Sequence, residues 1–587
     1  MNVLIDTNVE FKMNKLQAID IIKNFTGNTC IDQIVYGNTT SVCTGVVLSV
    51  HASIDVIKKA IQNGANLIIV HEPSFYTAND RLPWLEANEV YQFKKKLLDD
   101  NGITIWRHNV GGGPAYNYLG AAKTLGWENY TADCRTYTIP ETTVKELAGF
   151  LVEKLNLNGA RFVGNPGAKV SRIYLGDNIG GWGVDERIYM DMIRENIDVL
   201  IPLESWDWTA PAYVLDASQL GQNKAIIGLG AYNVREAGVK YLAEIYPSLF
   251  DDDFPIEFVQ SGADMYEFVE NARIDEWKPE IKKANSANAP AGGMAGKTNS
   301  EIILSIRKYH SPDLSISVEC DKIIYGEKYA NDACKGVVTT MHPTIEVIKE
   351  TIKLGYNLIV VHEPTFYNSW DSADLYAADE IVVAKKKLLD GNRIVIWRDH
   401  DHLHQNQNDP YTGAPTRCDH TFWGAAMSLG WAGHKTNYDS YPGGINPYKV
   451  YELPEMKIGD MAKYIVEKMN LKGGRIIGNP EATASKTVLG THILAGEDTE
   501  DEYCVTNFFL NPGIEVIVPN EIQDNLALSY CLDAKQMKKN KAVLNYAHYN
   551  MEEFGMQYMA ICFSEKIWGG DMPVAYVQSG DMYNYMI

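Results

Sequence analysis

Three clusters of histidine and acidic residues in the second half of the chain could bind metal ions. His362 and Glu363 directly follow the apolar run NLIVV, and four of the five residues at 400–404 (HDHLH) are potential ligands. His548 and Glu552 are four residues apart, so on a helix they project from one face. A lone histidine after a strand is most often held by a backbone carbonyl, and a solvated surface is the alternative for the loop. Three clusters together favour a shared metal site.

Strands and helices alternate before these clusters, in a pattern that is easiest to see in the first half. GVVLSV (45–50) is a β-rich run, Ser53 is a candidate N-cap for a helix that ends at Gly64, and NLIIV (66–70) is a second apolar strand. Such a βαβ unit predicts a parallel sheet covered on both faces. Ligands gather at the carboxyl ends of parallel strands, so we expect the clusters to lie on one rim.

The chain contains this unit twice. A shift of 291 positions aligns Val47–Tyr76 with Val338–Tyr367, and 17 of those 30 positions are identical. Later segments keep the same order, such as VEKLNLNGARFVGNP and VEKMNLKGGRIIGNP. We therefore predict an α/β fold of two tandem copies of a two-layer unit with mixed, largely parallel sheets. The expected divisions are a repeat at 1–280, a linker rich in Ala, Asn, Gly and Ser at 281–300, and a second repeat at 301–587.

The two repeats differ at the positions that would complete a metal site. The first half keeps His71 and Glu72 but has lost three partners: Gly113 aligns with His404, Ala231 with His548, and Arg235 with Glu552. An arginine would repel a cation, so the N-terminal repeat is predicted to carry a degenerate site. Alternatively, both halves form one composite pocket, with Arg107 and Arg235 reaching across to the metals of the other half.

The potential ligands of the second repeat exceed what one four-coordinate ion uses. The predicted metal ligands are His362, Glu363, His400, His404, His548 and Glu552. We interpret them as a site for two divalent ions, and mixed imidazole and carboxylate ligation suits Zn, Mn or Fe. Paired ions polarise an electrophile and lower the pKa of a bridging water, which is hydrolytic chemistry.

The motifs GYNLIVVHEPTFY, IVIWRDHDHLH and AHYNMEEFG resemble the NGG-interacting-factor-three-like dinuclear metal family, many of whose members are named GTP cyclohydrolase I type two. The resemblance covers nearly all of both halves. It implies that a His-His pair, a downstream Asp and a C-terminal H-x-x-x-E hold two metals. Here Glu363 replaces the second His and His404 the Asp, while His362, His548 and Glu552 match. Since family members form ring-shaped hexamers, the resemblance implies a trimer of fused repeats.

Three further residues of the second half are candidates for catalysis: Arg398, Asp401 and Glu521. Arg398 follows the strand IVIW and could clamp a substrate carboxylate or phosphate, or form an ion pair that fixes the loop. Glu521 ends another strand, aligns with Glu204, and is a candidate general base. The aromatic residues Trp106, Trp397, Tyr367 and Tyr549 could floor a pocket for a planar ring, although core packing is the ordinary role of such side chains.

Bulk properties exclude some classes of function. A net charge of -22 argues against wrapping nucleic acid or lying on an anionic membrane. The lysine triplets at 94–96 and 385–387 are interpreted as solvated helix faces. Nine scattered cysteines and no targeting or membrane segment favour a cytoplasmic protein. The leading hypothesis is a metal-dependent hydrolase for a small molecule, acting on a C–N bond of an amide or heterocycle, and the alternative is a non-enzymatic metal-binding scaffold.

Overall fold

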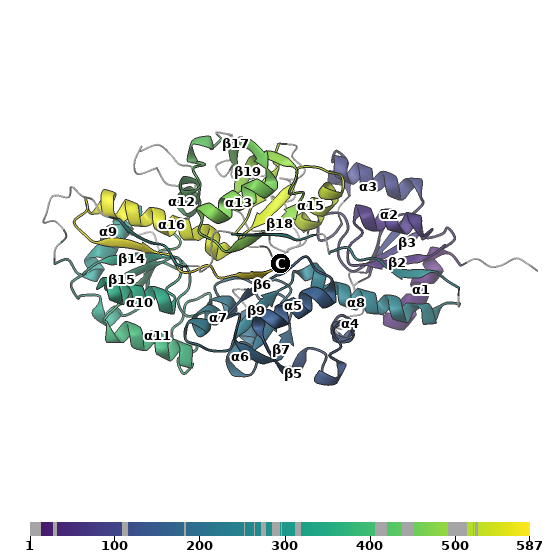
Figure 1. Cartoon of the computed structure of the whole chain (residues 1–587). Coiled ribbons are helices and arrows are strands. Elements are labelled where there is room, and N and C mark those ends of the chain that lie inside the picture. The colour runs from purple at the N-terminus through teal and green to yellow at the C-terminus, as the bar shows by residue number, and fades with distance from the viewer. Residues whose placement is uncertain are drawn as a thin grey trace, which may run out of the picture.

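The computed structural model describes most of the chain as four mixed sheets with helices packed on them (Figure 1). The described residues are 13–27, 32–80, 82–108, 115–180, 184–251, 253–262, 265–271, 278–284, 294, 296–310, 319–404, 420–436, 450–490, 493, 513–520, 522 and 526–587. Parallel pairs lie at the centre of each sheet and antiparallel pairs at the edges, except at one edge of the N-terminal outer sheet, where the last pair is parallel. This confirms the predicted α/β class of two tandem units with mixed sheets.

Each repeat builds an outer sheet from its first and last strands. The N-terminal outer sheet has the order β1 (Gln33–Tyr36), β4 (Thr104–Arg107), β3 (Leu67–Val70), β2 (Val46–Ser49), β10 (Ile256–Phe258). Its helices are α1 (Lys15–Thr26), α2 (Ile54–Gln62), α3 (Glu89–Asp100) and α8 (Ala231–Ile245). The Ser53 hydroxyl accepts from the backbone of Val56, as the predicted N-cap should.

The C-terminal outer sheet repeats this arrangement and adds one strand. Its order is β12 (Ile281–Ala284), β22 (Val574–Val577), β14 (Val337–Thr340), β15 (Leu358–Val361), β16 (Val395–Arg398), β13 (Ile323–Tyr325). Its helices are α9 (Asn299–His310), α10 (Ile345–Leu354), α11 (Glu380–Gly391) and α16 (His548–Cys562). Residues 281–284, expected at the start of a linker, are thus an edge strand, because β22 offers them unpaired backbone groups.

The middle of each repeat forms an inner sheet. The N-terminal one has the order β23 (Asn584–Met586), β6 (Ala160–Val163), β9 (Ala225–Gly228), β8 (Val199–Ile201), β7 (Lys169–Leu175), β5 (Thr136–Thr143), with helices α4 (Ala115–Leu125), α5 (Val144–Leu155), α6 (Val184–Glu195) and α7 (Ala210–Gln219). The C-terminal one has the order β11 (Glu267–Glu270), β18 (Gly473–Gly478), β21 (Ala542–Asn545), β20 (Val516–Val518), β19 (Thr483–Leu489), β17 (Val450–Lys457), with α12 (His420–Ser428), α13 (Ile458–Lys468) and α15 (Leu526–Gln536).

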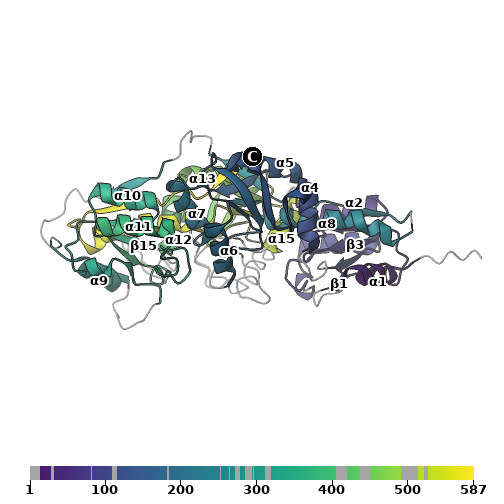
Figure 2. The same cartoon turned by 90° about the horizontal axis from the view of Figure 1, so that it is seen from below.

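The repeats exchange strands. β11 of the first repeat pairs with β18 of the second, and the C-terminal β23 pairs with β6 of the first. Figures 1 and 2 show the two inner sheets together in the middle, with one outer sheet at each end of an elongated molecule. Each inner sheet is therefore completed by the other repeat.

Buried charges also join each outer unit to the opposite repeat. Asp216 on α7 accepts from the backbone N–H of Ile345 and from Lys385, both at 2.8 Å. Asp533 on α15 accepts in the same way from Ile54 and Lys94, again at 2.8 Å. Both lysines are fully buried. The interpretation of the two triplets as solvated faces was therefore wrong at their first positions, where a carboxylate of the other repeat compensates the charge.

None of the helices in the described part of the chain is long and apolar enough to cross a membrane.

Candidate metal centre in the C-terminal repeat

Three elements of the C-terminal repeat carry the predicted ligands to one place. His362 and Glu363 follow β15, and Arg398 with the loop 399–404 follows its parallel neighbour β16. Because neighbouring parallel strands end at the same edge of a sheet, these segments meet there. α16 begins at His548, and its first turns bring His548 and Glu552 to this edge.

The backbone is strained where α16 begins. Ala547 precedes His548 with φ 80° and ψ 152°, a conformation that favours glycine. Further along, Gly424 of α12 lies against Phe554 and Gly555, so that a Cβ there would meet the Phe554 carbonyl oxygen at 2.5 Å. Glycines at this crossing let α12 and α16 pack closely and fix the position of α16.

Five donor atoms converge at the edge. The Glu552 Oε2 atom lies 3.0 Å from His362 Nε2 and 3.0 Å from His548 Nε2. His548 Nε2 is also 3.2 Å from Glu363 Oε1, and His362 Nε2 is 3.1 Å from His404 Nε2. Ligands bound tetrahedrally at about 2.1 Å stand roughly 3.4 Å apart. The spacing is therefore close to that of a coordination shell.

The hydrogen bond on the far side of His362 shows that this set suits a cation. His362 Nδ1 lies 3.1 Å from the Asp399 carbonyl oxygen, which can only accept, so Nδ1 carries the proton. Nε2 therefore faces the Glu552 carboxylate and the His404 ring nitrogen. Either a proton or a metal ion on Nε2 makes these contacts favourable, and a carbonyl behind a ligating imidazole is a usual feature of metal sites.

The site stabilises ionised carboxylates. Burial by itself would raise the pKa of Glu363, but the hydrogen bond from His548 and the charge of Arg398 lower it to about 2. The pKa of Glu552 is likewise held well below its usual value, because His548 and His362 outweigh burial. Burial would lower the pKa of His362, yet the hydrogen bond to Glu552 raises it. At neutral pH both carboxylates are anions available to a cation.

His400 and His404 form a second group with His362. The rings of His362 and His400 are stacked with centroids 4.6 Å apart, and one nitrogen from each of the three rings lies within 4.8 Å of the others. Burial lowers the pKa of His400 to about 4, so its ring is neutral at pH 7. Its Nδ1 lies 2.9 Å from Asp401 Oδ1, which leaves Nε2 with a free electron pair. The two groups share His362 and together fit more than one ion.

The candidate catalytic residues are placed as follows. Asp401 contacts His400 and accepts from the Cys320 backbone at 3.1 Å, so it orients a ligand. Arg398 is buried and donates to the His362 carbonyl at 2.9 Å and to Glu363 at 3.3 Å, an ion pair of the kind expected to fix the loop. Glu521 lies outside the described residues.

The four aromatic residues considered as a pocket floor are all core residues. Trp106, Trp397, Tyr367 and Tyr549 are no more than 1% exposed. Their apolar neighbours in sequence belong to buried strands or helices, which explains why sequence alone did not separate a pocket from the core.

Three residues that the sequence analysis did not include support the ligands. Asp321 accepts from the backbones of His400 and Asp401 at 2.8 Å each, and so holds the ligand loop in shape. Asn520 donates to Glu552 Oε1 at 2.6 Å. The histidine-rich loop HDHLH indicates that some carboxylate supports it. No local sequence pattern identifies that residue as Asp321, which is 79 residues away in the chain.

The third supporting residue comes from the N-terminal repeat. The Trp208 ring meets the His548 ring edge-on, with centroids 5.0 Å apart, and its Nε1–H donates to the Ser369 hydroxyl at 3.1 Å. The site is therefore composite, as one alternative proposed, but the contribution is Trp208 rather than Arg107 or Arg235.

The equivalent place in the N-terminal repeat contains an internal cation. Arg235 forms an ion pair with Glu72, and His71 Nε2 lies 3.9 Å from the same carboxylate. Burial first, then Arg235 and Arg107, lower the pKa of His71 to about 3. Arg107 donates to the Ala78 carbonyl at 2.6 Å within its own repeat. Gly113 lies outside the described residues.

Residues 32–264 match the family model described as Duf34/NIF3 (NGG1p interacting factor 3). The N-terminal repeat is therefore of the Duf34/NIF3 type. The matched Duf34/NIF3 segment lies in the repeat with the internal cation, and the internal duplication extends the relationship to the second repeat.

Solved structures match between 42% and 43% of the chain. A Staphylococcus aureus hypothetical protein is 19% identical, with 42% of this chain and 96% of that chain covered and a TM-score of 0.32. A Bacillus cereus protein related to NIF3 is 16% identical (43% and 97% covered, TM-score 0.32), and reduced HcgD from Methanocaldococcus jannaschii is 19% identical (42% and 97% covered, TM-score 0.28). No curated protein matches the chain. Likeness at this level says nothing about activity.

Proposed function

We propose that this chain is a metal-dependent hydrolase that acts on a C–N bond of a small amide or heterocycle, with its chemistry in the C-terminal repeat. The observation that carries the proposal is the convergence of His362, His548, Glu363 and Glu552 on one buried point. His404 and His400 adjoin it, and together these residues would hold two divalent ions of Zn, Mn or Fe. Such ions supply Lewis acidity, which polarises an electrophile and activates water.

The protein groups around the ions hold charge and geometry. Arg398 and Asn520 each occupy one carboxylate oxygen, on Glu363 and Glu552 respectively, and leave the other oxygen turned to the histidines. The neutral His400 ring presents the electron pair of Nε2 to an ion, while Asp401 holds the proton on Nδ1 and so orients the ring.

Two tryptophans of the N-terminal repeat favour a planar substrate. Trp206 packs against Trp208 with centroids 4.5 Å apart, and Trp208 meets His548. The buried Nε1–H of Trp206 has no hydrogen-bond partner within the described part of the chain, so it is available to a polar atom of the substrate. Aromatic faces and one donor suit a flat heteroatom-containing ring.

Metal analysis tests the first part of the proposal. The purified full chain should contain Zn, Mn or Fe by elemental analysis, and the chelator-treated protein should rebind the metal in a calorimetric titration. His548→Ala should weaken binding by more than about 100-fold, since outer contacts alone are worth 10- to 100-fold. His434→Ala, at an exposed site, should leave binding unchanged. A protein without bound metal that also fails to bind added metal would exclude the proposal.

The alternative is a non-enzymatic metal-binding scaffold. It is favoured by the N-terminal repeat, which keeps the interlocked fold while Arg235 pairs with Glu72. A screen of nucleotides, lactams and cyclic ureides for hydrolysis separates the two functions. If the protein is an enzyme, His548→Ala should abolish turnover and leave the assembly intact. An absence of turnover by the metal-loaded protein would support the scaffold function.

We also propose that fused repeats assemble as a trimer. Strand exchange makes one chain a closed pair of units, and three such pairs would complete a six-unit ring. The molar mass of the full chain measured by light scattering tests this assembly.

A further inference from the structure

The two outer sheets end differently. In the C-terminal repeat, β22 is covered by β12, with Ile281 opposite Val577 and Ala284 opposite Val574 in an antiparallel pair. In the N-terminal repeat, the equivalent strand β10 pairs with β2 on one side and with no other strand of the described residues. The edge that β12 covers in one repeat thus has no covering strand among the described residues of the other, and is called the open edge below.

The open edge presents backbone groups and apolar side chains. The backbone hydrogen bonds between the β10 segment and β2 use the Pro255 carbonyl and the Val259 N–H, at 2.8 and 2.9 Å. Since backbone groups alternate along a strand, the N–H and C=O of Ile256 and Phe258 face outward. Both side chains are half-buried, whereas every residue of β22 is buried.

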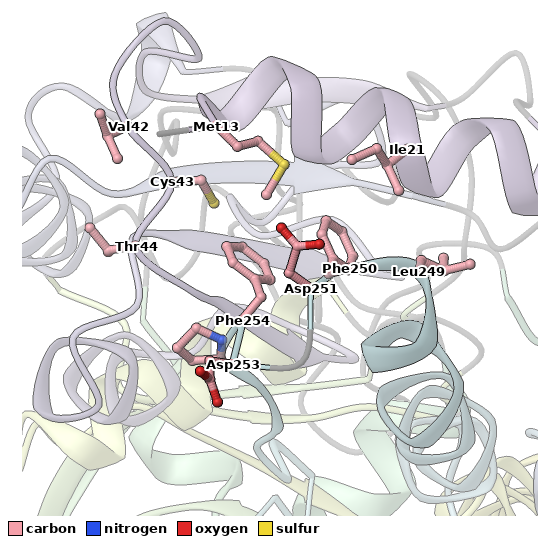
Figure 3. Close-up of a pocket in the computed structure, with 11 residues that line it drawn as sticks. Met13, Ile21, Val42, Cys43, Thr44, Leu249, Phe250, Asp251, Asp253 and Phe254 are labelled. Atoms are coloured by element: carbon pink, nitrogen blue, oxygen red, sulfur yellow. The ribbon is translucent and has the colours of Figure 1, made fainter. Parts of the chain in front are cut away.

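A cavity of about 620 Å³ adjoins this edge. Its lining includes Met13, Cys43, Phe250, Phe254 and Pro255, and Figure 3 shows Met13 and Phe254 directed into the same space. An apolar side chain of a docked segment would find a place in it.

In the C-terminal repeat, described residues of the chain lie beside the corresponding region. Ala284 and Met294 pack against the core there, which includes Cys334, the counterpart of Cys43. Trp568 in the same core donates to Ser305 of α9 at 2.9 Å. The C-terminal repeat therefore shows how an extended strand covers this edge.

Charge indicates which segment would fit. Lys283 of β12 lies opposite Ala575, and the position of Ala575 in the first repeat is the exposed Glu257. Asp251 and Asp253 line the adjoining cavity. A lysine at the position of Lys283 would therefore lie opposite a carboxylate, and cross-strand pairs of opposite charge are favourable.

We propose that the open edge of β10 and the adjoining cavity form a docking site for an extended basic segment of a partner polypeptide. The segment adds as an antiparallel strand, with a lysine opposite Glu257 and an apolar side chain in the cavity. Backbone hydrogen bonds provide affinity and the carboxylates select a basic sequence, as in other cases of strand addition.

A peptide with the sequence of residues 278–294, KPEIKKANSANAPAGGM, is a suitable probe for the full chain, because it carries the lysine and ends in an apolar methionine. Labelled with a fluorophore, it should bind saturably, with a dissociation constant on the order of 100 µM. Glu257→Lys should weaken binding about tenfold or more, because like charges then face each other. Glu141→Lys is the matched control, since Glu141 is an exposed acid on β5, another edge strand.

Hydrogen exchange locates the bound peptide. The amides of Ile256 and Phe258 should become protected, because they face the added strand. Faster exchange at residues 281–284 instead would mean that the peptide displaces β12 from β22, and would overturn the proposal. An equal loss of affinity in both charge variants, or no saturable binding to the unmodified chain, would overturn it too.

Discussion

At the end of β3, His71 and Glu72 face the guanidinium of Arg235, whereas at the end of β15 the same pair, His362 and Glu363, faces His548 and Glu552. The strands before both pairs are buried and nearly identical. The difference therefore arises on the helix that crosses the strand ends. Ala231 and Arg235 stand where the second repeat has the candidate ligands His548 and Glu552, and Arg235 supplies an internal cation.

The comparison also shows what both repeats retain. Asp216 and Asp533 each hold a buried lysine and a helix N-terminus of the other repeat. His342 and His51 lie 3.9 Å from these carboxylates. Both repeats therefore retain the contacts that join them, whereas only the second repeat retains the full set of candidate ligands.

Replacing the internal cation gives the largest expected change. Ala231→His with Arg235→Glu would place His and Glu where the second repeat has His548 and Glu552. We expect the double variant to bind additional metal in its N-terminal repeat with roughly micromolar affinity, which corresponds to about 8 kcal/mol. The metal content per chain, measured by elemental analysis after dialysis, checks this. Arg235→Glu alone lacks the imidazole and should bind far less, and equal binding by both variants would contradict the comparison.

Breaking the retained contacts should affect both repeats equally. Asp216→Asn leaves Lys385 buried without its carboxylate, and Asp533→Asn does the same to Lys94, so each should destabilise the chain by roughly 3 to 5 kcal/mol. Chemical denaturation measures the loss. Asp55→Asn removes an exposed pair with Lys58 and should cost less than about 1 kcal/mol. A large cost for only one of the buried variants would show that the two interfaces are not equivalent.

In the metal-free chain, His71 and His362 should contribute to the pH dependence of the free energy of unfolding with opposite signs. In the folded chain the pKa of His71 is about 3, below its unfolded value of 6.5. The contribution of His71 to the free energy of unfolding is therefore lost as the pH falls below 6.5. Between pH 7 and 5 the loss is about 2 kcal/mol. The pKa of His362 is raised, so its contribution is lost as pH rises above 6.5.

Denaturation of His71→Asn and His362→Asn at both pH values tests these signs. His71→Asn should reduce the loss of stability on acidification, and His362→Asn should increase it. If both variants change the pH dependence in the same direction, the assigned charges are wrong.

The smallest effect concerns the residue before each crossing helix. Ala547 adopts φ 80°, and its counterpart in the first repeat is Gly230 with φ 88°. Ala547→Gly should stabilise the chain by about 1 kcal/mol, because glycine adopts this conformation without a Cβ penalty. Thermal unfolding measures the gain, and metal binding should persist. A loss of stability would mean that the Cβ of Ala547 contributes more packing than strain.

The sequence alone was sufficient for the duplication, the βαβ units and the convergence of the candidate ligands His362, Glu363, His404, His548 and Glu552. These depend on local patterns: apolar runs that end in polar residues, helix caps, and a spacing of four on a helix. The absence of candidate ligands in the first repeat could be predicted in the same way, because the arginine that aligns with Glu552 is positively charged whatever its surroundings.

Only the tertiary structure decided which groups support the ligands and how the repeats interlock. Asp321, Asn520 and Trp208 come from other elements, and Arg398 binds a loop because its neighbours bury it. The exchange of β11 and β23 depends on which sheet edges lie open near the chain ends. Such long-range pairings are set by burial and hydrogen bonding across the whole molecule, and no local sequence pattern records them.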